Sequence, residues 1–378
     1  MEMKGMKKVL WGICFWTALA AFTGYIALDT FVLTKSYNTN AVEMNTSMFA
    51  DASAEEKDAS QTAAGAQAEN DQTAQAQQSA NDAQWQRPGP YGGRSSRDGK
   101  GGPPDFGGSF GGRFPGGFWD NSGDSSSSIP VKTGDYTGDT TYQDDHVKIT
   151  LNTYEQNNTK IYVADVTVTS AQYLKTAFAN NTYGKNVTAT TSSIAQSNNA
   201  ILAINGDYYG AQESGYVIRN GIVYRSSAKG SDVLCVYADG TMEVVSDRDY
   251  TADQLVQKGV WQAFSFGPAL VENGSVTVGT NTEVGRGMAS NPRTAIGVID
   301  ANHYVFVVSD GRTNESEGLS LYELAQFMQG LGVQTAYNLD GGGSSTMYFN
   351  GQIVNNPTTT GRIQERSVSD IVYIGKDA

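Results

Sequence analysis

The sequence predicts an α+β domain built mainly from antiparallel strands, and two observations carry that prediction. From about Ile129 the composition turns to alternating β-branched and aromatic residues. Four two-residue turn signals separate these strand-like runs, and each is an Asn-Gly or Asp-Gly pair of the kind that closes a hairpin with both turn residues at positive φ. The four pairs are Asn220-Gly221, Asp239-Gly240, Asn273-Gly274 and Asn350-Gly351.

Residues 1–35 are predicted to be a short cytoplasmic stub followed by a transmembrane signal anchor. Three lysines precede an uncharged run from Val9 to Leu28. Twenty residues at about 1.5 Å each match a hydrocarbon core of about 30 Å, and the lysines favour a cytoplasmic N-terminus. The alternative is a signal peptide cleaved near Ala18-Leu19-Ala20. Both interpretations export the rest of the chain, so we expect a single-pass protein of the cell membrane with an extracytoplasmic domain.

Residues 36–130 are predicted to be a flexible tether. This stretch contains no Leu, one Val and one Ile, too few apolar residues to bury a core. Its first half is rich in Ala, Gln, Asn and Ser, and residues 87–128 are Gly-rich with scattered aromatic residues. The folded domain is therefore expected to cover residues 131–378.

Within the domain, a fifth hairpin is expected between Ile296–Ile299 and Tyr304–Val308. The clearest helix covers Ser320–Gly330, because Ser320 and Glu323 form a capping box ahead of an apolar stripe of period 3.6. Two weaker helical candidates are Thr191–Asn198 and Ala252–Lys258.

Charge and composition exclude several functions. With 26 Lys+Arg against 39 Asp+Glu, the chain has a net charge of −13 and lacks the basic excess of a nucleic-acid-binding protein. Two His and two Cys argue against a His/Cys zinc site and against a disulfide framework. Carboxylates, Asn, Arg and backbone amides must then carry the chemistry.

The segment from 304 to 346 has the order strand, helix, strand, and polar residues follow both strands. The first strand ends in Asp310-Gly311-Arg312, and the second ends in Asp340 followed by three glycines. Because such a crossover usually makes its two strands parallel, Asp310 and Asp340 should lie at one edge of the sheet, where open sheets bind ligands. Consecutive glycines also allow backbone N–H groups to form an anion-binding concavity.

Two further segments add polar groups. Asn205-Gly206-Asp207 follows the apolar run Ala200–Ile204, and Arg293 precedes the strand that starts at Ala295. Alone, each of these motifs is explained by a turn or a surface charge. Together they supply carboxylates, an amide, two guanidinium groups and a glycine loop, which suit a sugar joined to an anion.

These motifs resemble the phosphodiester glycosidase family. The resemblance rests on NGDYY (205–209), NPRTAIGV (291–298), SDGR (309–312) and NLDGGGSSTMYF (338–349), with RSVSD (366–370) downstream. It covers roughly residues 145–376, and the family often shows NGGFF where this chain has NGDYY. It implies hydrolysis of a sugar-1-phosphodiester between sugar C1 and the bridging oxygen.

Such a reaction needs an anion clamp and a carboxylate near C1, acting as nucleophile or as base for water. Asp340 is the first candidate for the carboxylate, followed by Asp310 and Asp207. The residues expected to hold phosphate or sugar hydroxyls are Asn205, Gly206, Arg293, Arg312, Gly341, Gly342, Gly343, Ser344 and Arg366.

The resemblance implies no required cofactor, although carboxylates could hold a structural Ca²⁺. The expected partners are a glycan or sugar-phosphate polymer of the cell envelope or an exopolysaccharide, and the membrane through the N-terminal helix. Two alternatives remain at this point. One is a metal-assisted phosphodiesterase that uses the same carboxylates to cleave a P–O bond, and the other is a non-catalytic glycan-binding module.

Overall fold

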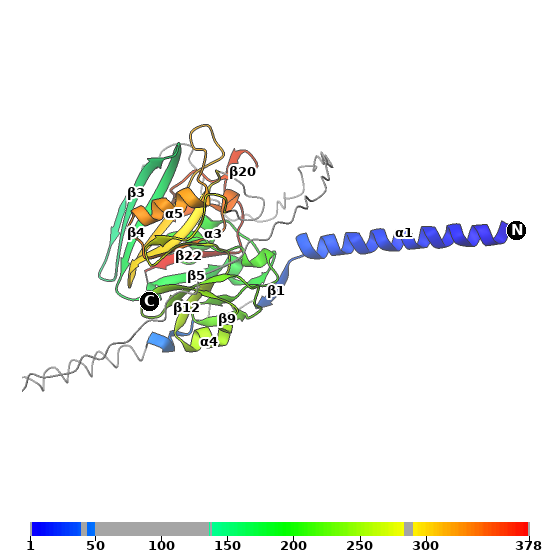
Figure 1. Cartoon of the computed structure of the whole chain (residues 1–378), viewed down its shortest axis with the longest axis horizontal. Helices are drawn as coiled ribbons and strands as arrows, with labels where there is room; N and C mark the ends of the chain where they lie inside the picture. The colour runs from blue at the N-terminus through cyan, green and yellow to red at the C-terminus, as the bar shows by residue number, and fades with distance from the viewer. Residues whose placement is uncertain (1, 39–43, 50–135, 137, 283–289, 377–378) are drawn as a thin grey trace, which may run out of the picture. The chain divides into compact units, whose positions relative to one another are not determined.

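The computed structural model describes residues 2–38, 44–49, 136, 138–282 and 290–376 of the chain (Figure 1). The described helices are α1 (Glu2–Phe31), α3 (Thr191–Ser197), α4 (Ala252–Gln257) and α5 (Leu321–Gly330). The three helices expected inside the domain are confirmed within one residue at each end. Both α4 and α5 begin with a complete capping box, in which the N-cap side chain and the N3 side chain bond each other's backbone N–H groups.

Strands dominate the described part of the chain, and all their pairings are antiparallel, which confirms the predicted α+β class. The largest sheet has eight strands in the order β14 (Ser275–Val276), β13 (Ala269–Glu272), β17 (Thr335–Asn338), β15 (Arg293–Asp300), β16 (His303–Ser309), β4 (Thr159–Val168), β3 (Val147–Gln156) and β2 (Thr141–Gln143).

Two five-stranded sheets and two ribbons complete the sheet structure of the described residues. One sheet runs β19 (Gln352–Ile353), β18 (Met347–Phe349), β7 (Ala200–Asn205), β22 (Asp370–Gly375) and β5 (Leu174–Phe178). The other runs β11 (Met242–Ser246), β10 (Asp232–Tyr237), β12 (Val260–Phe264), β8 (Val217–Arg219) and β9 (Ile222–Arg225). The ribbons pair β1 (Lys35–Asn38) with β6 (Tyr183–Lys185), and β20 (Thr358–Thr359) with β21 (Arg362–Ile363).

All five predicted hairpins are present. In three of them both turn residues have positive φ, as an Asn-Gly type I′ turn requires. The Asp239-Gly240 turn differs, because Gly240 is left-handed (φ 88°) and Asp239 is not. Asp239 instead accepts hydrogen bonds from the backbone N–H and the hydroxyl of Thr241, so its side chain closes a wider loop.

The central strands of the eight-stranded sheet are buried on both faces, as the residues of β16 show. Tyr304, Phe306 and Val308 belong to the main core, together with residues of β7 and β22 from the neighbouring sheet. Val305 and Val307 point the other way and join a second core beneath α5. Successive side chains of a strand point to opposite faces, so one strand serves both cores. Figure 1 shows α5 lying against this sheet.

The predicted strand–helix–strand unit is β16–α5–β17. Its two strands are each antiparallel to β15, which lies between them, so β16 and β17 run in the same direction. Their carboxyl ends therefore reach the same edge of the sheet, as the sequence predicted. The sequence did not show that β15 separates them and brings its first residue, Arg293, to that edge.

The structure does not support the predictions for the N-terminal anchor and for the start of the tether. Residues 2–31 are helical, yet no helix in the described part of the chain is both long enough and apolar enough to cross a membrane, so the anchor predicted over Val9–Leu28 gains no support. The start of the predicted tether also belongs to the folded unit: β1 pairs with β6, and Phe49 lies edge-on against the buried ring of Trp261 (5.0 Å between ring centroids). Residues 39–43 and 50–130 of that tether lie outside the described residues.

Candidate functional site

The ends of three strands meet at one edge of the eight-stranded sheet. Arg293 pairs with Ser309 across β15 and β16, and Ala295 pairs with Asn338 across β15 and β17. Asp310 follows the first of these partners directly and Asp340 follows the second by two residues. The structure thus brings Arg293, Asp310 and Asp340 to one edge, as the strand order requires.

The neighbouring sheet contributes the end of β7, and Asn205 ties it to this edge. Asn205 is completely buried. Its Nδ2 donates to the backbone oxygen of Asp340 (2.6 Å), while its Oδ1 accepts from the Thr294 hydroxyl (2.8 Å) and the Thr346 N–H (3.3 Å). Because each of these partners is protein, Asn205 holds the site together and does not lie where a sugar hydroxyl could reach it.

Backbone strain marks the same region. Among the described residues, thirteen non-glycine residues have positive φ, and ten of them are Asn, which tolerates the left-handed conformation. The other three are Tyr208 (φ 63°), Arg312 (φ 62°) and Thr360 (φ 50°). They lie on the three loops that surround the glycine loop 341–343, and such strain persists where surrounding structure enforces it, often at functional sites.

The three glycines are needed because other groups approach them closely. A methyl group built on Gly341 would lie 2.9 Å from the Pro292 oxygen, one on Gly342 would lie 2.9 Å from Nη2 of Arg312, and one on Gly343 would lie 2.6 Å from Oγ1 of Thr359. All three contacts are shorter than real Cβ contacts allow. The loop is thus a bare surface against which the Arg312 guanidinium and the Thr359 hydroxyl pack.

Most backbone N–H groups of this loop donate hydrogen bonds to other groups of the protein. The Gly342 N–H donates to the Pro292 oxygen (2.8 Å), and the Ser344 and Ser345 N–H groups donate to Gly341 and Gly342. The Gly341 N–H bonds the Asp340 carboxylate. The expected anion-binding concavity therefore has fewer donors to offer than the glycine run suggested.

Asp340 sits in a small charged cluster beside the glycine loop. Its Oδ2 accepts from Nη2 of Arg366 at 2.7 Å, and Nε of Arg366 donates to the Ser344 hydroxyl at 2.9 Å. Burial raises the pKa of Asp340, while the charge of Arg366 and the hydrogen bond with Ser344 lower it in part. Because the Arg366 side chain is 41% exposed, the cluster opens to solvent on the arginine side.

Two more guanidinium groups lie close to this cluster. Arg312 is exposed and donates through Nε and Nη2 to Asn291 (3.1 and 3.0 Å), which holds it against Gly342. Arg293 is buried, and its Nε donates to the Leu319 oxygen (2.8 Å). Burial, together with the positive charge of Arg312, lowers the pKa of Arg293 to about 10. Three guanidinium groups thus lie near the buried carboxyl group of Asp340, an arrangement that attracts an anion.

Asp310 has a different environment from Asp340. Its carboxylate accepts from the Tyr162 hydroxyl (3.1 Å), from Nδ2 of Asn355 (3.2 Å), and from both the backbone N–H (2.8 Å) and Nδ2 (3.3 Å) of Asn356. Burial raises the pKa of Asp310, and these hydrogen bonds oppose the rise. With four donors on its two oxygens, Asp310 anchors the 355–356 loop beside the site.

Asp207 lies in a buried ion triad. Its Oδ1 accepts from Nη2 of Arg219 (2.8 Å), and its Oδ2 accepts from the Ser265 N–H (2.9 Å). Nε of Arg219 donates to Oδ2 of Asp370 (2.9 Å), and all three side chains are at most 2% exposed. Gly206 admits this arrangement, because a methyl group there would lie 2.2 Å from the Asp370 carboxylate. Both oxygens of Asp207 therefore accept hydrogen bonds within the protein, and its role is structural.

Sequence reasoning missed several residues of this region. Tyr208 is 43% exposed, and its ring lies 6.0 Å from the Arg366 guanidinium carbon. Thr359 and the Asn355–Asn356 pair were also missed, since they come from a loop far along the chain. For Tyr208, the departure from the family's usual NGGFF pattern was the available signal. In the described ranges, no group of three or more His, Cys, Asp or Glu side chains is placed to hold a metal ion.

Comparisons with known proteins agree with the motifs. The sequence profile of the family described as phosphodiester glycosidase matches residues 198–375. The chain is 29% identical over 180 residues to an uncharacterised SPbeta prophage-derived protein of Bacillus subtilis, a match covering 46% of this chain and 28% of that protein. It is 32% identical over 139 residues to human N-acetylglucosamine-1-phosphodiester alpha-N-acetylglucosaminidase, which covers 32% of this chain and 25% of the human protein. The matches thus span about a quarter of these relatives.

A solved structure shares the fold. The catalytic domain of zebrafish N-acetylglucosamine-1-phosphodiester alpha-N-acetylglucosaminidase superposes with a TM-score of 0.50 at 19% identity. The superposition covers 66% of this chain and 87% of the zebrafish domain. At this identity the likeness establishes the architecture only.

The close approach at Gly206 predicts a large loss of stability in Gly206→Ala. The new methyl group would collide with the buried Asp370 carboxylate, and neither can move without breaking the ion triad, so we expect a loss of at least about 2 kcal/mol in the free energy of unfolding. Gly330→Ala is the matched control, because nothing lies within 4 Å of a methyl group there. Urea unfolding of both variants checks this, and equal stabilities would contradict it.

The ion triad also predicts a specific pH dependence. Burial, with the nearby charge of Asp207, raises the pKa of Asp370 to about 7 although Arg219 opposes the rise. Between about pH 4 and pH 7 the folded chain therefore binds more protons at Asp370 than the unfolded chain, so this group's contribution to stability falls as pH increases. Asp370→Asn cannot titrate. Relative to this variant, the wild type should lose roughly 1–3 kcal/mol between pH 4.5 and pH 7.5. The free energies of unfolding of both proteins are measured in urea at each pH. If they changed in parallel with pH, the raised pKa of Asp370 would be contradicted.

Proposed function

The profile of the phosphodiester glycosidase family matches residues 198–375 of the chain, and from that match we propose that the chain hydrolyses a sugar-1-phosphodiester. The bond broken is the one between sugar C1 and the bridging oxygen, and the products are a reducing sugar and a phosphomonoester. The proposed substrate is a glycan or sugar-phosphate polymer of the cell envelope or an exopolysaccharide. The location of this protein outside the cytoplasm stays a prediction from the sequence.

One observation carries the proposal: the buried carboxyl group of Asp340 contacts the partly exposed guanidinium group of Arg366 at the edge of the sheet, and the exposed Arg312 packs nearby. Arg366 contacts Asp340 directly, and Arg312 packs on the glycine loop two residues further on. A glycosyl phosphodiester presents groups that match this arrangement: an electrophilic C1 and, beyond the bridging oxygen, a negatively charged phosphate. Guanidinium groups bind phosphate bidentately.

The proposed roles follow from the exposure of each group. Arg312 and Arg366 are the accessible cations and would hold the phosphate, while buried Arg293 strengthens the positive potential from behind. An incoming phosphate would draw Arg366 toward itself and leave Asp340 available as nucleophile or as base for water. A phosphate is a good leaving group, so the reaction makes little demand on a general acid. Asp310, with its four hydrogen-bond donors, would position the neighbouring loop.

Hydrolysis of a minimal diester in ¹⁸O-labelled water tests the reaction. The proposed substrate for this test is the methyl phosphodiester of N-acetylglucosamine-1-phosphate. Cleavage of the C1–O bond places the label in the sugar, whereas cleavage of a P–O bond places it in the phosphate. Mass spectrometry of the products decides between the two, and label in the phosphate would contradict a glycosidase.

Asp340→Asn should abolish most turnover while the protein stays folded. The substitution keeps the size of the side chain but removes the charge that attacks C1 or activates water, so kcat should fall by at least roughly 10³-fold, about 4 kcal/mol of transition-state stabilisation. Substrate affinity should change little or even improve, because the substitution removes a negative charge that repels the substrate phosphate.

Asp247→Asn provides the matched control for that experiment. Asp247 is also a buried aspartate, but its carboxylate caps the backbone N–H groups of the 229–231 loop, apart from the glycine loop. The Asp247→Asn substitution should lower the melting temperature and leave kcat within a few-fold of wild type. If folded Asp340→Asn also kept near-normal turnover, Asp340 would not be the reacting carboxylate, and Asp310→Asn would be the next variant to measure.

A further inference from the structure

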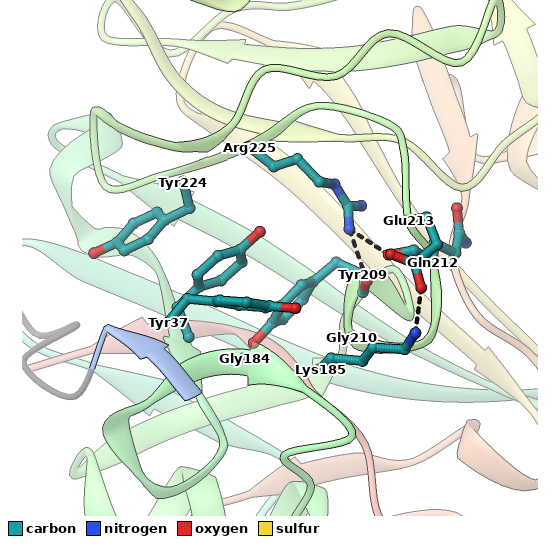
Figure 2. Close-up of a pocket in the computed structure, with 10 residues that line it drawn as sticks. Tyr37, Gly184, Lys185, Tyr209, Gly210, Gln212, Glu213, Tyr224 and Arg225 are labelled. Atoms are coloured by element: carbon teal, nitrogen blue, oxygen red, sulfur yellow. Dashed lines mark hydrogen bonds and ion pairs between the residues drawn. The ribbon is translucent and has the colours of Figure 1, made fainter. Parts of the chain in front are cut away.

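A cavity lies beside Tyr209, the last residue of the 205–209 motif. It has a volume of about 400 Å³ and is built from β1, β6, β9 and the 209–213 loop (Figure 2). The side chains that define it are Tyr37, Tyr183, Lys185, Tyr209, Glu213 and Tyr224. None of these residues belongs to the candidate site described above.

Four tyrosines form a continuous aromatic wall with Tyr183 at its centre. The Tyr183 ring stacks on Tyr209 (5.2 Å between centroids, 16° between planes) and contacts Tyr224 at 5.2 Å and Tyr37 at 5.9 Å. Tyr183 and Tyr209 are buried, Tyr224 is half-buried, and Tyr37 is 62% exposed. The two inner rings thus fix the two outer ones, which face a space open to solvent.

Charged groups complete the other wall. Lys185 is paired with Glu213, and its side chain is only 10% exposed while that of Glu213 is 76% exposed. Arg225 is held rigidly, because it donates to the backbone oxygens of Tyr209 and Gln212 (Figure 2) and of Gly215. The wall carries two positive charges and one negative charge on a chain whose net charge is −13. This local balance favours a neutral or anionic ligand over a cation.

We propose that this cavity binds a pyranose unit of the glycan substrate, next to the unit that reacts at Asp340. The proposal rests on the proposed function for its substrate class. The volume falls within the range of about 300–1,000 Å³ typical of small-molecule sites. The apolar face of a sugar ring packs on tyrosine rings, and its hydroxyl groups pair with Lys185 and Glu213 at the rim.

Two consecutive residues connect the cavity to the reacting site. Tyr208 lies beside Arg366, which contacts Asp340, while Tyr209 lines the cavity. The backbone of Tyr208 is left-handed (φ 63°), its ring lies near Arg366, and the ring of Tyr209 stacks on Tyr183 instead. A polymer whose reacting unit lies at Asp340 therefore has an aromatic subsite one residue away along the same loop.

Kinetics on a short and a long substrate test the subsite. The short substrate is the single-sugar methyl phosphodiester, and the long one is a trimer of N-acetylglucosamine-1-phosphate units joined by phosphodiesters. Tyr37→Ala and Tyr224→Ala should each raise KM for the trimer about 10-fold and leave kcat on the short substrate within about twofold. Tyr37 is exposed, so this variant keeps the fold even if Tyr224→Ala does not. An unchanged KM for the trimer in folded Tyr37→Ala would overturn the subsite.

Tyr154→Ala is the matched control, since Tyr154 is also an exposed strand tyrosine with one edge-on aromatic contact, to Phe327. It should behave as wild type on both substrates. Calorimetric titration of the trimer into the Asp340→Asn chain, with and without Tyr37→Ala, separates this proposal from the proposed function. Weaker binding in the double variant supports the subsite even if the wild type hydrolyses neither substrate. Equal binding overturns it even if hydrolysis is observed.

Discussion

The buried side chain of Asn205 joins the two sheets from which the site is built. It links the end of β7 to Thr294 at the start of β15 and to the backbone of Asp340, all within 2.8 Å or less. A fully buried amide with these partners cannot be replaced without leaving several polar groups unsatisfied. Together with the shared apolar core, this one residue fixes the end of β7 against the edge of the larger sheet, and hence the position of Asp340.

Around that link, the site is crowded enough to impose backbone strain. The three glycines of the 341–343 loop admit Pro292, Arg312 and Thr359 at distances that a Cβ atom would forbid. Tyr208, Arg312 and Thr360 adopt left-handed conformations that cost free energy for such residues. Such strain is often retained at functional sites, and here two of the strained residues bring the Arg312 guanidinium group against Gly342 and the Tyr208 ring near Arg366.

The carboxylates of this region differ in role because their surroundings differ. The carboxylate oxygens of Asp310 and Asp207 accept hydrogen bonds from donors within the protein, so these two residues hold loops in place. Asp340 contacts an arginine that is partly exposed, and a ligand phosphate could compete for that arginine. The same loop that carries Asp207 then presents Tyr208 to the site and Tyr209 to the aromatic cavity. One loop thereby connects a proposed reacting centre to a proposed subsite.

Local sequence was sufficient to predict the antiparallel class, the hairpins, the capped helix α5 and the common edge shared by Asp310 and Asp340. These features depend on turn chemistry, periodicity and strand direction, which neighbouring residues encode. The sequence could not show that Asp207 pairs with Arg219, that Asn205 is buried, or that Arg366 bonds Asp340, because each partner lies on a strand or loop distant in the chain. It also suggested a tether where residues 35–38 and 44–49 contact the domain. Only the packing of the sheets brings such groups within hydrogen-bonding distance, and that packing decides which polar residues are structural and which remain accessible to a ligand.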